Sequence, residues 1–265
     1  MTLIQILTLA LIQGLTEFLP VSSSAHLILG GKAFGWADQG LVFDVATHLG
    51  TLLAVLFYFR ADLFAMARAC VRPATADAGP EGRRMALFIA LGSLPALAVG
   101  FLLYDWVEMY LRDVRVIAWT TIGFGLLLWL ADLVGARGRE LSGMTLRSAM
   151  MIGLAQVLAL VPGTSRSGIT ITAGRALGFS PDAAARFSFL LSIPVIAGSG
   201  GYGALRVTTG DAPIDWLQFM AALVIAALAG WACIAVFLAL LKRVGLLPFV
   251  VYRLALGVIL LWMVY

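Results

Sequence analysis

Long stretches of apolar residues with few charges constrain the fold of this chain more than any other feature. Most of them approach the roughly 20 residues that a helix needs to cross the hydrocarbon core of a bilayer. The runs comprise residues 41–59, 85–103, 114–130, 193–205, 216–241 and 246–265. They show no sustained alternation of apolar and polar residues, which argues against a β-barrel. The sequence therefore predicts an all-α integral membrane protein.

The composition supports one membrane domain over residues 1–265. Hydrophobic residues make up 62% and charged residues 12% of the chain, whereas soluble domains are about half apolar and a quarter charged. The net charge of +4 would suit nucleic acid, but the basic residues are scattered over loops, and we expect no nucleic-acid partner. Basic loops report orientation instead.

Basic-rich and acid-rich loops alternate along the chain. The loops around 60–84, 135–147 and 242–245 are basic, so the positive-inside rule predicts that they are cytoplasmic and that both termini are periplasmic. No basic residue precedes the first apolar stretch, residues 3–19, and we expect it to be mature structure rather than a signal peptide.

Two shorter apolar stretches, residues 3–19 and 146–161, each end at a proline and a cluster of hydroxyl residues. Each is followed by a second short apolar piece, at residues 27–31 and 169–177. A proline with polar residues between two short apolar pieces predicts a re-entrant helix–loop–helix, whose irregular backbone must be buried in protein or line a wet cavity. We call residues 20–26 the first tip and residues 162–168 the second tip.

The two tips resemble each other, which predicts an internal repeat. Gln13 precedes the first tip and Gln156 the second. The repeats would cover about 1–140 and 141–265, each with one re-entrant pair and three transmembrane helices, six in all. Because three spans is an odd number, the second repeat would insert with inverted topology. Such folds place their site near the midplane, between the repeats.

The first tip and the apolar stretch before it contain several polar residues. Placing such residues inside a membrane costs free energy, and they usually have a function there. Glu17 lies four residues after Gln13, on the same face of a helix. Three serines and a histidine follow Pro20, namely Ser22, Ser23, Ser24 and His26. Taken alone, the serines would be capping residues and the histidine structural. Their place beside Glu17 favours a functional site.

The second tip is typical of an anion-binding turn. Arg166 lies among small and hydroxyl residues, which are Gly163, Thr164, Ser165, Ser167 and Gly168. We expect a helix to begin near Ile169, with Thr170 in its first turn, so that free N–H groups and the helix dipole converge on one spot. The planar fork of Arg166 matches phosphate oxygens. Together the tips offer a carboxylate, an imidazole, hydroxyls and an arginine, the groups that phosphoryl transfer requires.

Three other charged or titratable residues are predicted to lie outside the site. His48 is expected to lack a polar environment and to be structural. Arg175 and Arg186 are expected at the cytoplasmic surface.

The segment QGLTEFLPVSSSAH (residues 13–26) resembles the first motif of the bacterial undecaprenyl-diphosphate phosphatases, the bacitracin-resistance family. PGTSRSG (162–168) resembles their second motif. The similarity extends to FSFLLSIP (187–194) and PFVVYR (248–253), and so covers essentially the whole chain.

The resemblance implies hydrolysis of undecaprenyl diphosphate to the monophosphate and inorganic phosphate at the outer face of the bacterial inner membrane. This step recycles the lipid carrier for cell-wall synthesis and removes the target of bacitracin. The implied partners are a polyprenyl diphosphate substrate and membrane lipids, and the implied cofactor is a divalent cation, Mg²⁺ or Ca²⁺. Whether the chain forms a homodimer stays open.

By position, the resemblance assigns catalysis to Glu17, Ser23, His26 and Arg166, and the metal to Glu17 and Gln13. The expected substrate-binding residues are Ser22, Ser24, Gly163, Thr164, Ser165, Ser167 and Thr170. Gln13 stands where many relatives have a glutamate, and Ser24-Ala25 replaces a commoner Thr-Gly. Attack by His26, attack by Ser23 and activation of water by His26 all remain open.

A transporter or flippase of a phosphorylated lipid or anion is the alternative, because inverted repeats with an anion cradle are also a transporter architecture. The cluster of Glu17, Ser23 and His26, which carriage alone would not require, favours the enzyme.

Overall fold

A computed structural model describes residues 1–37, 39–71, 80–111, 113–135, 138–209 and 214–264. This part of the chain is helical, with no strand beyond one isolated bridge between Arg139 and Phe179. The helices are α1 (Leu3–Thr16), α2 (Ser23–Ala33), α3 (Gly40–Tyr58), α4 (Arg60–Val71), α5 (Pro80–Tyr110), α6 (Val114–Val134), η1 (Leu141–Gly143), α7 (Leu146–Gln156), η2 (Val157–Leu160), α8 (Arg166–Ala176), α9 (Pro181–Thr209), α10 (Trp216–Val244) and α11 (Leu247–Trp262). The predicted all-α class is confirmed.

Five helices of the described part are long and apolar enough to cross a membrane. They contain the segments Gly40–Tyr58, Glu81–Leu103, Val114–Val134, Pro181–Thr209 and Trp216–Val244. The sixth predicted span corresponds to α11, which has 16 residues. It reaches about 24 Å at 1.5 Å per residue, short of the roughly 30 Å hydrocarbon core.

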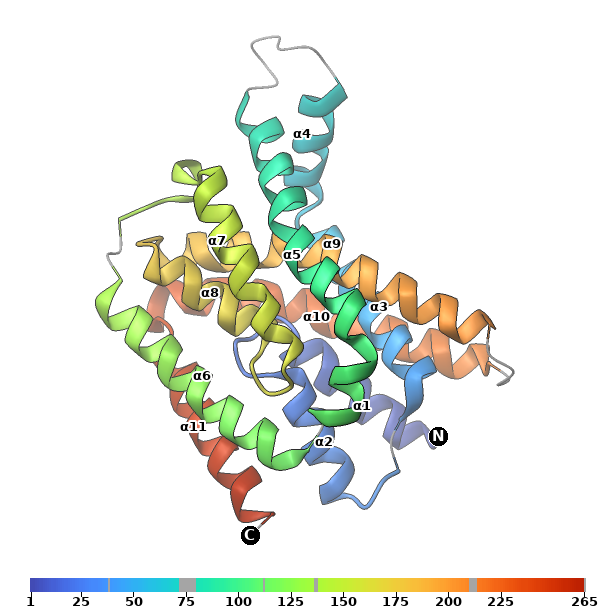
Figure 1. The fold of residues 1–265 in the computed structure, drawn as a ribbon. Coiled ribbons are helices and arrows are strands. Elements are labelled where there is room, and N and C mark those ends of the chain that lie inside the picture. Colours follow the sequence, from blue (N-terminus) through green and yellow to red (C-terminus); the bar gives the residue numbers. More distant parts are fainter. Residues whose placement is uncertain (38, 72–79, 112, 136–137, 210–213, 265) are drawn as a thin grey trace.

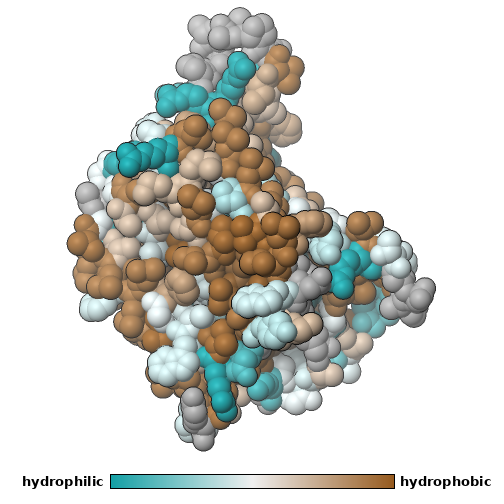
Figure 2. All heavy atoms as spheres, viewed as in Figure 1, coloured by the Kyte–Doolittle hydropathy of each residue, from teal (hydrophilic) through white to brown (hydrophobic). Residues whose placement is uncertain are grey.

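The outer surface agrees with a membrane protein that crosses the bilayer several times. In Figure 1, α4 and the start of α5 project from one end of the body, and both termini lie toward the other. Hydrophobic residues cover the middle of the face in Figure 2, whereas hydrophilic residues gather near the base of the projection and at the lower end. Exposed large apolar side chains, such as Leu133, Val236 and Val258, suit contact with lipid tails.

Small residues let α1 and α3 pack closely on α10. A Cβ atom added at Gly14 would lie 2.6 Å from the Cβ of Ala229, and one added at Gly50 would clash with the carbonyl oxygen of Leu223. Close approach of backbones at small residues is how helices associate in lipid, where burying apolar area gives little driving force. These contacts fix α1, and hence Gln13 and Glu17, relative to the long helices.

Two sequence-based expectations about the second tip and its helix are wrong. Helix α8 begins at Arg166 rather than near Ile169, because the Ser165 hydroxyl caps it by accepting a hydrogen bond from the Gly168 N–H. Thr170 therefore lies beyond the first turn. Arg175 is fully buried rather than at the surface, since its Nε donates to Asp132 Oδ1 at 2.8 Å.

The remaining expectations about charge fare differently. Arg186 is partly exposed, as expected, and pairs with Asp62 at 3.5 Å. Two of the basic loops that predict the orientation include residues 72–79 and 136–137, which lie outside the described residues.

Replacing Gly50 by Val tests the packing of α3 on α10. The added side chain would meet the α10 backbone, and overpacking of this kind costs about 1–3 kcal/mol. We expect the apparent Tm of the detergent-solubilised protein, followed by size-exclusion chromatography after heating, to fall by several degrees. Gly123→Val on α6 is the matched control, because a Cβ there meets nothing within 4 Å. Equal Tm values for the two variants would contradict this packing.

Candidate active site

The two tips lie against each other although they are far apart along the chain. The N–H of Gly163 donates to Ser24 Oγ at 3.4 Å, and the hydroxyl of Ser167 donates to the Leu19 carbonyl at 2.8 Å. Each contact joins a serine near the start of one helix to backbone in the other tip or directly next to it. A single site built from both tips requires them to lie close together, and this proximity is confirmed.

Both tips turn into their helices through a serine with the same unusual backbone conformation. Ser22, which precedes α2, has φ 71°, and Ser165, which precedes α8, has φ 70°. They are the only non-glycine residues with positive φ in the described part of the chain. Such conformations are costly and persist only where the surroundings enforce them.

The fully buried guanidinium of Arg253 on α11 holds both tips in place. Its Nη1 donates to Pro20 O at 3.3 Å, and its Nη2 donates to Gly163 O at 3.0 Å and to Thr164 O at 2.9 Å. Its Nε donates to Thr121 O on α6 at 3.2 Å. The sequence reasoning missed this role, although Arg253 is the only charged residue in the apolar run 246–265.

Glu17 and Arg166, one from each tip region, form an ion pair at 3.1 Å, with side chains 9% and 12% exposed. The other carboxylate oxygen, Glu17 Oε2, accepts hydrogen bonds from the Ser23 hydroxyl at 2.9 Å and from Gln13 Nε2 at 3.0 Å. Arg166 Nη1 also donates to the Ser188 carbonyl at 3.3 Å. Three of the four predicted catalytic residues thus form one connected cluster.

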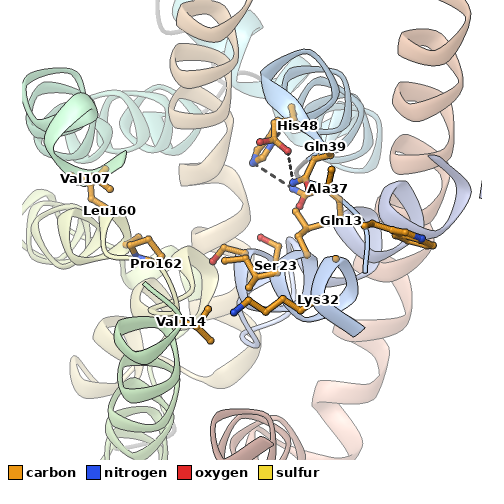
Figure 3. A pocket seen from close by; sticks show the side chains of 17 residues that line it. Gln13, Ser23, Lys32, Ala37, Gln39, His48, Val107, Val114, Leu160 and Pro162 are labelled. Carbon is orange, nitrogen blue, oxygen red and sulfur yellow. Dashed lines mark hydrogen bonds between the residues drawn. The ribbon is translucent and has the colours of Figure 1, made fainter. Parts of the chain in front are cut away.

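A cavity of about 500 Å³ borders this cluster through Gln13 and Ser23, whereas Glu17 and Arg166 are not among the residues that line it (Figure 3). We call it the polar cavity, after the polar side chains on part of its wall. Gln13, Ser23, Ser24 and Pro162 line it next to the tips, and Lys32 lines it from the last turn of α2. Its wall also includes Trp36, Gln39, Asp44, His48 and Val107. The cavity is large enough for a diphosphate with water, and it offers cationic and hydroxyl groups to phosphate oxygens.

His26 is turned to other partners and is not among the residues that line this cavity. Its Nδ1 lies 2.7 Å from the Ser22 carbonyl, and its Nε2 lies 2.8 Å from the hydroxyl of Tyr252, whose ring stacks on the imidazole. Both ring nitrogens are therefore engaged within the protein. A catalytic role for His26 stays a prediction from the motif.

Most of the predicted substrate-binding residues form ties within the protein. The hydroxyls of Ser22 and Ser24 lie 3.1 Å apart, and those of Ser165 and Ser167 3.2 Å apart. Thr170 Oγ1 lies 2.7 Å from Ser188 Oγ. Gly163 has φ 90°, and a Cβ there would clash with Thr120, while Thr164 Oγ1 is buried without a partner among the described residues. Of these residues, only Ser24 lines the polar cavity.

The expectation that His48 lacks polar neighbours is wrong. Its Nε2 lies 3.5 Å from Gln13 Nε2, and its Nδ1 lies 2.7 Å from the Asp44 carbonyl, one turn earlier in α3. Figure 3 shows His48 and Gln13 facing each other at the cavity. The position of His48, a titratable residue inside an apolar helix, was the sequence signal that could have indicated its place at the cavity.

The residues at Glu17 fit a divalent cation. Gln13 Oε1 is buried without a hydrogen-bond partner in the described part of the chain, and it belongs to the amide that already contacts Glu17. A carbonyl and a carboxylate oxygen are ligands that hard cations prefer. No group of three His, Cys, Asp or Glu side chains with metal-binding geometry occurs among the described residues, so the amide is part of the fit.

An apolar cavity of about 520 Å³ adjoins the polar one. Leu97, Phe101, Val195 and Tyr202 of α5 and α9 line it. The two cavities share three wall residues, Val107, Ala159 and Leu160. A polar chamber next to an apolar one suits a ligand with a charged head and an apolar tail.

Comparison with known proteins places the chain in a family. The model of the family described as bacitracin resistance protein BacA matches residues 6–259. The chain belongs to this family. A relative from Alteromonas mediterranea named undecaprenyl-diphosphatase is 50% identical over 265 residues, all of both chains. Undecaprenyl-diphosphatase 2 of Stutzerimonas stutzeri is 51% identical over 98% of each chain, and the undecaprenyl-diphosphatase of Alcanivorax borkumensis is 52% identical over 97% of each.

Replacing Arg253 by Lys tests how this BacA-family protein holds its tips together. A lysine has no planar fork and cannot serve all four carbonyls, and each buried carbonyl left unpaired costs about 1–3 kcal/mol. We expect a clearly lower Tm in detergent. Arg243→Lys, at an exposed position in the last turn of α10, keeps the charge and should leave Tm unchanged. A wild-type Tm for Arg253→Lys would contradict the role.

Proposed function

We propose that this chain hydrolyses undecaprenyl diphosphate to undecaprenyl phosphate and inorganic phosphate, and so recycles the lipid carrier of cell-wall synthesis and confers bacitracin resistance. The observation that carries the proposal is the contact of Glu17 with both Arg166 and Ser23 beside the polar cavity. It occurs in a chain about half identical to undecaprenyl-diphosphatases over its whole length. A transporter of phosphate would need the positive charge of Arg166, but it would not need a serine hydroxyl hydrogen-bonded to a carboxylate.

In this proposal the diphosphate lies in the polar cavity. Lys32 on the cavity wall and Arg166, which is paired with Glu17 next to the cavity, neutralise its oxygens. Ser24 and backbone N–H groups of the tips add hydrogen bonds. Arg166 Nη2 pairs with Glu17, and Nη1 donates to the Ser188 carbonyl. These two contacts hold the guanidinium in place while phosphate is bound.

We propose Ser23 as the nucleophile, since its hydroxyl lies 2.9 Å from Glu17 Oε2 and lines the cavity. Ser23 Oγ bonds to the terminal phosphorus, the bond from that phosphorus to the bridging oxygen breaks, and undecaprenyl phosphate leaves. Glu17 takes the hydroxyl proton and passes it to the departing oxygen. Water then attacks the phosphoserine, Glu17 takes its proton and returns it to Ser23 Oγ, and inorganic phosphate is released.

Glu17 and Gln13 would hold a divalent cation, Mg²⁺ or Ca²⁺ in our expectation, with the buried Gln13 Oε1 as the carbonyl ligand. When bound, the cation supplies positive charge that stabilises the negative charge on the phosphate oxygens.

We further propose that α1–α2 and α7–α8 are re-entrant pairs and that the two halves are inverted repeats, with six spans including α11. The matched φ angles of Ser22 and Ser165, and the matched serine contacts across the tips, support the repeat. Because α11 is short, we expect the bilayer to thin locally around it or flanking residues to snorkel.

The protein is a multi-pass membrane protein, and we propose the bacterial inner membrane with the polar cavity open to the periplasm. Basic residues Arg60, Arg68, Arg83 and Arg84 gather on the α4–α5 projection, which the positive-inside rule assigns to the cytoplasm. Both termini lie away from that projection (Figure 1), as periplasmic termini require.

Removing the charged or nucleophilic group should abolish catalysis without unfolding the protein. We expect Glu17→Ala, Arg166→Ala and Ser23→Ala each to lower phosphate release from undecaprenyl diphosphate in detergent at least about 100-fold. Thr208→Ala, at an exposed hydroxyl that bonds only its own helix, should keep full activity. Substantial release by any of the three, or release by wild type that a chelator leaves unchanged, would contradict the corresponding assignment.

Filling the apolar cavity should weaken binding of long tails selectively. Gly198→Leu would press on Leu97 and occupy the cavity, and we expect KM for a long-chain polyprenyl diphosphate to rise about tenfold, the equivalent of about 1.4 kcal/mol. A short-chain substrate should be less affected. Gly201→Leu, three residues away with nothing within 4 Å, is the control. Equal KM values for the two variants would place the tail elsewhere.

A further inference from the structure

We propose that the imidazole of His48 is a nitrogen ligand of the divalent cation, together with the Glu17 carboxylate and the Gln13 amide oxygen. Mn²⁺ shares the preference of Mg²⁺ and Ca²⁺ for carboxylate and carbonyl oxygens, so it can occupy the same site and serve as the probe ion for a nitrogen ligand. This inference rests on the proposed function for the presence of a cation, and goes beyond it in the ligand set.

The tautomer of His48 follows from its neighbour. Nδ1 lies 2.7 Å from the carbonyl oxygen of Asp44, which can only accept a hydrogen bond. The ring proton therefore resides on Nδ1, and Nε2 presents a lone pair toward Gln13. A histidine whose second nitrogen donates to a backbone carbonyl is the usual arrangement of a metal ligand, because that bond fixes the tautomer and the ring orientation.

Two acceptor atoms face the same place in the structure. Glu17 Oε2 and His48 Nε2 lie 3.0 Å and 3.5 Å from the same atom, Gln13 Nε2. The amide group of Gln13 directs its two hydrogens toward these acceptors. The point between a carboxylate oxygen and a nitrogen lone pair favours a positive charge. A cation between the same two atoms would satisfy both more strongly.

Gln13 can supply the third ligand by a simple rotation. Its Oε1 is buried without a partner in the described part of the chain. Turning the amide by 180° exchanges Oε1 and Nε2, which brings the carbonyl oxygen to the point that faces Glu17 and His48. Three protein ligands leave coordination positions for water and phosphate oxygens, as a catalytic cation requires.

The chain has two histidines, and the second provides a matched comparison. His26 is engaged through both nitrogens, by the Ser22 carbonyl and the Tyr252 hydroxyl, and it does not line the cavity. Only His48 therefore offers a nitrogen lone pair at Glu17. The single substitution His26→Gln leaves His48 as the sole imidazole in the protein.

The test is electron spin-echo envelope modulation of Mn²⁺ added to the purified full-length protein in detergent. We expect the wild type and His26→Gln to show modulation from a directly bound ¹⁴N. We expect His48→Gln to lose it and to bind Mn²⁺ at least about tenfold more weakly. Labelling His26→Gln with ¹⁵N-histidine should convert the signal to that of ¹⁵N, which identifies His48 without substituting it.

Absence of nitrogen modulation in His26→Gln, or its persistence in His48→Gln, would overturn the proposal. If His48→Gln fails to fold, the ¹⁵N-labelled His26→Gln protein decides alone. Phosphate release with Mg²⁺ is measured on the same wild-type sample, so that a protein that binds Mn²⁺ through nitrogen but hydrolyses nothing would contradict the proposed function and not the ligand set.

Discussion

Backbone carbonyls in non-helical segments inside an apolar protein body need hydrogen-bond donors from the protein, because no bulk water reaches them. In this protein one side chain, Arg253, supplies donors to carbonyls of both tips and of α6. Its buried charge is compensated by these dipoles and gives the tips one relative position. The ion pair of Glu17 with Arg166 and the orientation of Ser23 depend on that position.

The structure distinguishes residues that hold the second tip in place from residues that line the polar cavity, a distinction that the sequence motifs do not show. Hydroxyl groups of the second tip and of α8 make contacts within the protein, as those of Ser165, Ser167 and Thr170 show. The polar groups that line the cavity come largely from α1, α2 and α3, and Arg166 of α8 is paired with Glu17 next to them. The second tip, which is predicted to bind an anion, also ties segments of the chain together, and its role in anion binding stays a prediction.

Sequence reasoning predicted the helical class, the contact between the tips and the neighbourhood of Glu17, Ser23 and Arg166, because spacing along one helix and polar residues in apolar runs are visible in one dimension. It missed pairs of interacting side chains that come from segments distant in the sequence. Arg175 finds Asp132 43 residues away, and His48 finds Gln13 from another helix. The start of α8 was misplaced because a capping serine with positive φ has no distinctive sequence signal.

The central claim is that residues 20–26 and 162–168 grip one diphosphate between them. A structure of the protein with a non-hydrolysable methylene analogue of a polyprenyl diphosphate tests it most directly. We expect both phosphorus atoms to lie in the polar cavity, with phosphate oxygens within hydrogen-bonding reach of Arg166 and Ser23, and the tail to lie in the cavity beside Leu97 and Tyr202. A headgroup bound instead in a separate cavity, which is lined by Asp182, Lys242 and Arg243, or tips that part when the analogue binds, would contradict it.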